Sequence, residues 1–278
     1  MVIGTDAQLS AYSFEIEQWR EKMENRLRAE DGWLALIGLY WLNEGQNTVG
    51  SNPNSDIPLP DAPGQVGVIE FHEGQASITA ADGVELLVDG VPTRTALLRD
   101  DTTKGGPTLV SVGSITFYVI RRGDQYGVRA RDTNNPDRLT FEGRNWFPID
   151  TNYRVTGKLI PHTPVRALQV INSVGQIVPI DNPGAVEFEL NGQTFMLEAF
   201  ASDEHQKELW FVFKDRTSGQ STYGAGRFMY APLAEDGTVI LDFNKAYHPP
   251  CAFTPYATCP RPPQGNVLPV AIEAGEHL

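Results

Sequence analysis

Short runs of β-branched and aromatic residues, separated by clusters of turn-forming residues, fill most of the chain after Gly45. The 278 residues include 26 glycines and 20 prolines. Glycine adopts the left-handed backbone of tight turns, and proline donates no hydrogen bond within a helix or a sheet. Runs such as VGVIEFHE, QASITA and SVGSITFYVI have the composition of strands. The pattern predicts a mainly β fold.

One amphipathic helix is expected before the strands. Apolar residues recur there at near-helical spacing, with polar residues between them. Ser13 is the candidate N-cap, and Gly32 marks a break. The apolar segment WLALIGLYWL that follows is expected to dock the helix onto the rest of the protein. The apolar residues are Phe14, Ile16, Trp19, Met23 and Leu27.

Two β domains are predicted after this helical segment, which gives a division into residues 1–44, 45–143 and 144–278. In the first β domain, alternation places Ile115, Phe117 and Val119 on one face of a strand, and VDGVP has the composition of a tight turn. This is the pattern of a β-sandwich. In the second, NGQ joins VEFEL to TFMLEAF as a hairpin, and a proline-rich, ordered loop follows from His248.

Charge and composition exclude several classes of partner. The formal net charge is -13, which argues against a nucleic-acid backbone or an anionic membrane surface. No apolar run approaches the ~18 residues of a spanning helix, and the N-terminus lacks the pattern of a secretory signal. Cys251 and Cys259 are too few for a disulfide framework, which fits a reducing compartment. We expect a cytoplasmic protein. The sequence does not determine its oligomeric state.

The segments GQNTVGSNPNSDIPLPD, LLVDGVP and SVGSITFYVI, between Gly45 and Ile120, resemble a forkhead-associated domain in the order of their turns and strands. The resemblance implies a β-sandwich of a kind that binds phosphothreonine peptides. However, the Gly-Arg of that family reads Gly50-Ser51 here, and its Ser-x-x-His element has no counterpart before His72. A phosphate would therefore lack its guanidinium and hydroxyl partners.

The whole chain, from about Trp19 to Ala274, more closely resembles the bacterial family catalogued as domain of unknown function 1684. The motifs that carry this resemblance are DGWLALIGLYWL, NWFPIDTNYRV, TYGAGRFMY and LDFNKAYHPPCAFTPYATCPRPP. The family has no established activity, so the resemblance implies a grouping and no mechanism.

The stretch from Tyr223 to Cys259 is the candidate functional site, because few structural loops need so many different polar groups. The leading hypothesis is a pocket for a small polar or anionic ligand, with Arg227 as the anion anchor beside Gly224 and Gly226. The alternative for Arg227 is a bulged strand in which it pairs with an acidic neighbour. The candidate ligand-binding residues are Arg154, Tyr223, Arg227, Tyr230, Asp242, Asn244, Tyr247 and Tyr256.

Three interpretations of His248, Cys251 and Cys259 remain open. In the first, they bind zinc, with a fourth ligand from His72, His162, His205 or an acidic residue; this is disfavoured, and no cofactor is predicted. In the second, Cys251 is a nucleophile activated by His248 or by another base that folding brings near, which would make the protein a cofactor-independent hydrolase. The third is preferred and makes the cysteines structural, as packed thiols or as a disulfide that closes a short loop.

A rival to the pocket comes from a different functional class. In that hypothesis the protein is a non-catalytic interaction module that uses the sandwich of residues 45–143 to hold a protein partner. It requires an exposed apolar or hydrogen-bonding surface on that domain.

Overall fold

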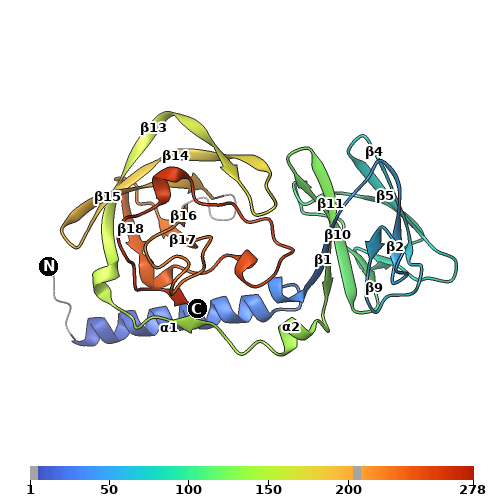
Figure 1. Ribbon diagram of the computed structural model, residues 1–278, viewed down its shortest axis with the longest axis horizontal. Helices are drawn as coiled ribbons and strands as arrows, with labels where there is room; N and C mark the ends of the chain where they lie inside the picture. The colour runs from blue at the N-terminus through green and yellow to red at the C-terminus, as the bar shows by residue number, and fades with distance from the viewer. Residues whose placement is uncertain (1–5, 203–207) are drawn as a thin grey trace. The chain divides into compact units, whose positions relative to one another are not determined.

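A computed structural model describes residues 6–202 and 208–278 (Figure 1). The protein is mainly β, with an N-terminal helix and several antiparallel sheets, as the sequence predicts. The chain divides into two compact units. Unit 1 comprises residues up to Arg26, Glu142–Phe253 and Thr258–Leu278; unit 2 comprises Leu27–Phe141 and Thr254–Ala257. Unit 2 thus interrupts the sequence of unit 1, and the predicted segment 1–44 is shared between the two units.

Helix α1 (Asp6–Arg28) is longer at its N-terminal end than predicted. Ser13 lies inside the helix, so it is not the N-cap. Ile16 and Leu27 are buried, as expected for the apolar stripe, but Phe14 is 63% exposed, which corrects its place in that stripe. Within the described ranges, no helix has the length and apolar character needed to cross a membrane.

The segment WLALIGLYWL forms a turn and a strand, which corrects its predicted role in docking the helix. A 3-10 turn (Trp33–Ala35) leads into β1 (Leu36–Trp41), which pairs with β11. Pairing satisfies the backbone polar groups of this apolar run, which is too short for an independent helix.

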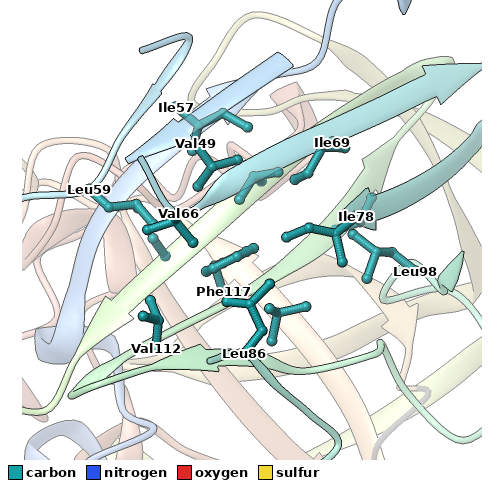
Figure 2. Packing of buried hydrophobic residues seen from close by; sticks show 14 of the residues in the cluster. Val49, Ile57, Leu59, Val66, Ile69, Ile78, Leu86, Leu98, Val112 and Phe117 are labelled. Carbon is teal, nitrogen blue, oxygen red and sulfur yellow. The ribbon is translucent and has the colours of Figure 1, made fainter. Parts of the chain in front are cut away.

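Unit 2 is a sandwich of two sheets, with strand orders β1-β11-β10-β9-β6-β7 and β3-β2-β4-β5-β8. Its core joins Val49, Ile69 and Ile78 of one sheet to Phe117 and Val112 of the other (Figure 2). The remaining elements are β2 (Gly45–Gly50), β3 (Ile57–Pro58), β4 (Gly67–His72), β5 (Gln75–Ala80), β6 (Leu87–Val88), β7 (Val91–Pro92), β8 (Thr95–Leu98), β9 (Val110–Val112), β10 (Ile115–Arg122), β11 (Gln125–Asp132) and the short helix α2 (Pro136–Leu139).

The predicted alternation in β10 is confirmed, because Ile115, Phe117 and Val119 are all buried. Asp89 and Gly90 adopt positive φ values of 48° and 81° between β6 and β7, which confirms the tight turn in VDGVP. At the ends of the inserted segment, the guanidinium carbon of Arg28 lies 5.0 Å from the ring centroid of Phe141.

Unit 1 is built on one antiparallel sheet with the order β17-β16-β15-β14-β13-β18. A bridge between Leu233 and Val239 links its two ends. Asn191 and Gly192 have positive φ values in the β14–β15 turn, as the NGQ hairpin predicts. The strands are β13 (Arg154–Ile171), β14 (Ile177–Leu190), β15 (Gln193–Ala201), β16 (Glu208–Phe213), β17 (Arg227–Pro232) and β18 (Thr238–Asp242); β12 (Asn145–Trp146) and β19 (Glu276–His277) form a separate small sheet.

The proline-rich C-terminal segment is an ordered loop, as predicted. It contains 3-10 turns at Pro250–Ala252 and Gln264–Asn266. The fully buried amide of Asn266 donates hydrogen bonds to the carbonyls of Glu198 and Val212, both at 2.9 Å. These bonds tie the loop to β15 and β16.

Replacing Phe117 by alanine tests the assignment of the unit 2 core. We expect Phe117→Ala to lower the free energy of unfolding by about 3–5 kcal/mol, because it leaves a cavity between the two sheets. Leu97, in the same unit, is 76% exposed, so Leu97→Ala should change it by less than about 0.5 kcal/mol. Urea titrations measure both values. Equal losses would mean that Phe117 does not lie in the core.

Candidate functional site

Arg227, at the start of β17, is 1% exposed. Its Nη2 donates to Asp215 Oδ2 at 2.6 Å and to the carbonyl of Ile272 at 2.9 Å, and its Nη1 donates to the carbonyl of Ala274. Burial lowers the pKa of Arg227, and the charge of Asp215 acts in the opposite direction. The prediction of an anion anchor is therefore wrong, because protein groups already occupy the guanidinium. The alternative, pairing with an acidic residue, agrees with the structure.

Gly226 is required by packing and not by a ligand. Its φ is 104°, and a Cβ at this position would lie 2.4 Å from the carbonyl oxygen of Phe213. At Gly224 an added Cβ would make only ordinary contacts with the backbone of Gly219, at 3.6 Å to its Cα and 3.9 Å to its nitrogen. Gly226 thus lets the chain enter β17 close to β16.

Asn244 is fully buried and joins two distant segments. Its Nδ2 donates to the carbonyl of Asp150 at 2.8 Å and to the hydroxyl of Tyr12 at 3.0 Å, and its Oδ1 accepts the amide of Asp150 at 3.0 Å. The side chain holds the start of β13 against the end of β18. It is a structural link and does not line a pocket.

His248 is buried beside Glu276. Its Nε2 accepts the amide of Tyr223 at 3.1 Å, and its Nδ1 lies 3.6 Å from Glu276 Oε1. Burial, followed by the charges of Arg227 and Arg144, lowers the pKa of His248 to about 3. Burial raises the pKa of Glu276 to about 7, although Arg144 Nη1 lies 2.5 Å from its carboxylate. The imidazole is therefore neutral near pH 7.

The predicted nucleophile–base pair of Cys251 and His248 does not form. The thiol of Cys251 donates to Ser173 Oγ at 3.2 Å, whereas both ring nitrogens of His248 face Tyr223 and Glu276. A base with a pKa near 3 is also too weak to deprotonate a thiol at neutral pH. The geometry thus does not supply activation of Cys251 by His248.

The zinc hypothesis requires several ligand side chains in one group. The described part of the chain contains no group of three or more His, Cys, Asp or Glu side chains that could hold a metal ion. Two of the candidate fourth ligands lie beside carboxylates: His162 is 3.2 Å from Glu198, and His72 is 3.4 Å from Glu44. His205 lies outside the described residues.

Two of the predicted tyrosines do not reach the cleft described below. The hydroxyl of Tyr223 donates to the carbonyl of Cys251 at 3.1 Å, and burial raises its pKa. Tyr256 belongs to the segment Thr254–Ala257 of unit 2. Tyr223 and Tyr256 therefore stay predicted ligand-binding residues that do not line the cleft.

A cleft of about 740 Å³ lies between helix α1 and the strands of unit 1. Four of the predicted ligand-binding residues line it: Arg154, Tyr230, Asp242 and Tyr247. The helix contributes five residues that the sequence analysis assigned to no site. The other lining residues are Glu15, Trp19, Lys22, Met23, Arg26, Glu208, Pro232, Ile240 and Lys245.

Among the described residues, the charged lining of this cleft is positive overall. It has four cationic side chains, Lys22, Arg26, Arg154 and Lys245, against the three acidic ones of Glu15, Glu208 and Asp242. The whole chain, by contrast, carries a formal net charge of -13. An anion would therefore meet a more favourable local potential here than over most of the protein.

Arg154 presents the most available guanidinium in the cleft. Its side chain is 49% exposed, its Nε lies 3.7 Å from Asp242 Oδ2, and its Cζ lies 5.6 Å from the ring centroid of Tyr12. In residues 6–202 and 208–278, its two Nη atoms make no hydrogen bond. Lys245, in comparison, is engaged by Glu15 at 2.6 Å.

Aromatic rings form the walls of the cleft. The ring of Trp19 on α1 lies 6.3 Å from that of Tyr247. Tyr230 on β17 is stacked on Trp210 at 6.2 Å, with 16° between the ring planes. The amphipathic pattern identified Trp19 as apolar, but it could not indicate that this face of the helix borders a cleft.

Comparison with known families identifies one match. The family model described as "Protein of unknown function (DUF1684)" matches residues 139–277. A search of curated proteins finds no significant match.

Three solved structures are similar to parts of the chain. The first is the NMR structure of an uncharacterized protein from Haloarcula marismortui, with 33% identity and a TM-score of 0.42 over 51% of this chain and 79% of that one. An FHA domain from a study of phosphothreonine-dependent interactions has 16% identity and a TM-score of 0.24, covering 34% and 92%. The N-terminal FHA domain of EssC, from the bacterial type VII secretion apparatus, has 19% identity and a TM-score of 0.26, covering 34% and 46%.

Gly226 and Gly224 provide a matched test of the close approach between the start of β17 and the end of β16. We expect Gly226→Ala to lower the free energy of unfolding by at least about 1–3 kcal/mol, because it combines a positive φ with a clash against backbone. Gly224→Ala should change it by less than about 1 kcal/mol. Thermal or urea unfolding measures both. Similar values for the two variants would show that the close approach at Gly226 does not exist.

The pH dependence of stability tests the buried state of His248. Its pKa falls from about 6.5 in the unfolded chain to about 3 in the folded protein, so its stabilising contribution is present above pH 6.5 and is lost as the pH falls through 3. His248→Gln keeps an acceptor for the Tyr223 amide and removes the titration. Between pH 7 and pH 5, the difference in unfolding free energy should shift by about 2 kcal/mol in favour of the variant.

Glu276 changes the pH dependence of the unfolding free energy in the opposite direction. Comparing wild type with His248→Gln removes this effect. Its pKa is raised to about 7, so its contribution is complete below the unfolded value and is lost as the pH rises through 7. Wild type and His248→Gln both carry Glu276. Urea titrations of both proteins across this pH range give the difference, and a difference independent of pH would contradict a buried, neutral His248.

Proposed function

The chain belongs to the DUF1684 family, whose description names no activity, and we therefore propose its function from the geometry of unit 1. We propose that the cleft between α1 and the sheet binds a small anionic ligand that carries an apolar or aromatic part. The observation that carries this proposal is the half-exposed guanidinium of Arg154, whose Nη atoms make no hydrogen bond within the described residues, in a cleft whose described lining has a net positive charge.

Arg154 suits the recognition of a carboxylate or phosphate. A guanidinium binds such groups through two parallel hydrogen bonds, which fix orientation as well as position. Asp242 does not neutralise it fully, because its carboxylate also accepts hydrogen bonds from Tyr12 at 2.9 Å and from the side chain of Asn244 at 3.2 Å. Asp242 instead orients the guanidinium from one side.

The walls of the cleft suit the remainder of such a ligand. Trp19, Tyr230 and Tyr247 offer aromatic faces, and Met23 and Ile240 add apolar contacts. A volume of about 740 Å³ falls in the range of about 300–1,000 Å³ typical of small-molecule sites. Stacking on these rings would bind a planar group, while Arg154 holds the charged end.

The proposal is for binding and not for hydrolysis. Cys251 and His248, the predicted nucleophile and base, are not among the residues that line the cleft. Among the residues that the structure describes, the lining supplies charges and rings, which position a ligand, and no cysteine, serine or histidine.

The interaction-module hypothesis for unit 2 has less support. Ser51 stands where phosphopeptide recognition would need a guanidinium. The loop between β2 and β3 also holds the carboxylate of Asp56, which accepts the amide and hydroxyl of Thr48 at 2.8 and 2.7 Å. These bonds lower the pKa of Asp56, so the loop carries a negative charge that repels phosphate.

The test compares three probes that share a benzene ring: benzoate, phenyl phosphate and benzylamine. We expect the two anions to bind saturably and to change the fluorescence of Trp19, and the cation to bind much more weakly. Arg154→Gln should weaken binding of the anions by at least about tenfold, because a charge-assisted hydrogen bond contributes roughly 1.5–3 kcal/mol. Calorimetric and fluorescence titrations measure these affinities.

Arg94→Gln is the matched control, since Arg94 is an exposed arginine of unit 2 that pairs with Asp82. It should leave anion binding unchanged. Equal binding of benzylamine and benzoate, or full affinity in Arg154→Gln, would overturn the proposal. The same holds if neither anion binds at all.

A further inference from the structure

Cys251 and Cys259 make reciprocal contacts within unit 1. The backbone amide of Cys251 donates to Cys259 Sγ at 3.3 Å, and the backbone amide of Cys259 donates to Cys251 Sγ at 3.3 Å. Both cysteines are in the reduced thiol form. The two cysteines therefore lie opposite each other at the two ends of the loop that joins them.

This arrangement brings the sulfurs within reach of each other. Only three covalent bonds separate a cysteine sulfur from its own amide nitrogen, so each sulfur lies close to both amides. A disulfide requires Cα atoms about 4.4–6.8 Å apart and Cβ atoms that point toward each other. The reciprocal amide–sulfur contacts of 3.3 Å are compatible with this geometry, and closing an S–S bond requires rotation about the Cα–Cβ bonds.

We propose that Cys251 and Cys259 are a redox-sensitive modification site that forms a reversible intramolecular disulfide, with a small-molecule disulfide as the oxidant. This inference is independent of ligand binding in the cleft. It selects one of the two structural roles that the sequence left open for the cysteines.

Cys251 is the residue that reacts first, because it is half-buried whereas Cys259 is 9% exposed. An amide hydrogen bond to sulfur favours the thiolate, which is the attacking form. The Cys251 thiolate attacks one sulfur of the oxidant, forms a mixed disulfide and releases one thiolate. The Cys259 thiolate then attacks Cys251 Sγ and expels the second. The protons lost by the two cysteines pass to the two released thiolates, and the oxidant takes up both electrons.

The disulfide would close a loop with a particular place in the chain. The chain leaves unit 1 after Phe253, contributes Thr254–Ala257 to unit 2 and re-enters unit 1 at Thr258. Both cysteines belong to unit 1 and flank this excursion. Oxidation would link Cys251 to Cys259, the cysteines of unit 1 on either side of the segment Thr254–Ala257.

The experiment treats the full chain with oxidised glutathione under native conditions, then denatures it and alkylates the remaining thiols. We expect two alkyl groups on the reduced protein and none on the oxidised one, which should have lost the mass of two hydrogen atoms. The oxidised chain should migrate as a monomer without reductant. The equilibrium constant for oxidation should be at least about tenfold larger for the folded chain than in urea, with a matching rise in the unfolding temperature.

Single variants distinguish the intramolecular bond from simple thiol reactivity. Cys259→Ser should stop at a stable glutathione adduct on Cys251, and Cys251→Ser should react more slowly than wild type. The wild-type measurements suffice if either variant does not fold. Two alkylatable thiols after oxidation, a persistent glutathione adduct on wild type, disulfide-linked dimers alone, or an equilibrium no more favourable in the folded chain than in urea would each overturn the proposal.

Discussion

The guanidinium of Arg227 connects three parts of unit 1 that are far apart in the sequence. It pairs with Asp215 and donates to the carbonyls of Ile272 and Ala274, so it fixes the C-terminal segment against the start of β17. That segment brings Glu276 to the buried side chain of Arg144 and to the amide of His248 at 2.7 Å. Loss of one partner would leave a buried, unpaired charge, which typically costs about 3–5 kcal/mol. Much of the polar interior therefore depends on one ion pair.

A second buried network orients the cleft. Asn244 and the hydroxyl of Tyr12, from α1, both donate to Asp242 Oδ1, and Asp242 Oδ2 lies beside Arg154. The position of the exposed guanidinium thus depends on the buried side chains of Asp242 and Asn244 and on the half-buried Tyr12. Among the candidate ligand contacts of the sequence, Arg227 and Asn244 build the scaffold, whereas Arg154, Tyr230, Asp242 and Tyr247 line the cleft.

The sequence predicts what local patterns determine. Alternation identified the buried face of β10, and Asp89-Gly90 and Asn191-Gly192 identified two turns, because each depends on neighbouring residues only. The burial of Arg227 could not be predicted in this way, since its partners lie 12 to 49 positions away. The helical half of the cleft was missed for the same reason: Trp19 meets Tyr247 only after folding.

The interruption of unit 1 by unit 2 has an evolutionary meaning. The two ends of the inserted segment meet, with Arg28 over the ring of Phe141 and its carbonyl accepting Arg138 Nε at 2.7 Å. Most of unit 2 is therefore a single inserted segment. One insertion or deletion in the gene would add or remove it and would leave the strands of unit 1 uninterrupted. The family match at residues 139–277 omits nearly all of this inserted segment and also omits α1. The limits of the family match therefore differ from the limits of unit 1.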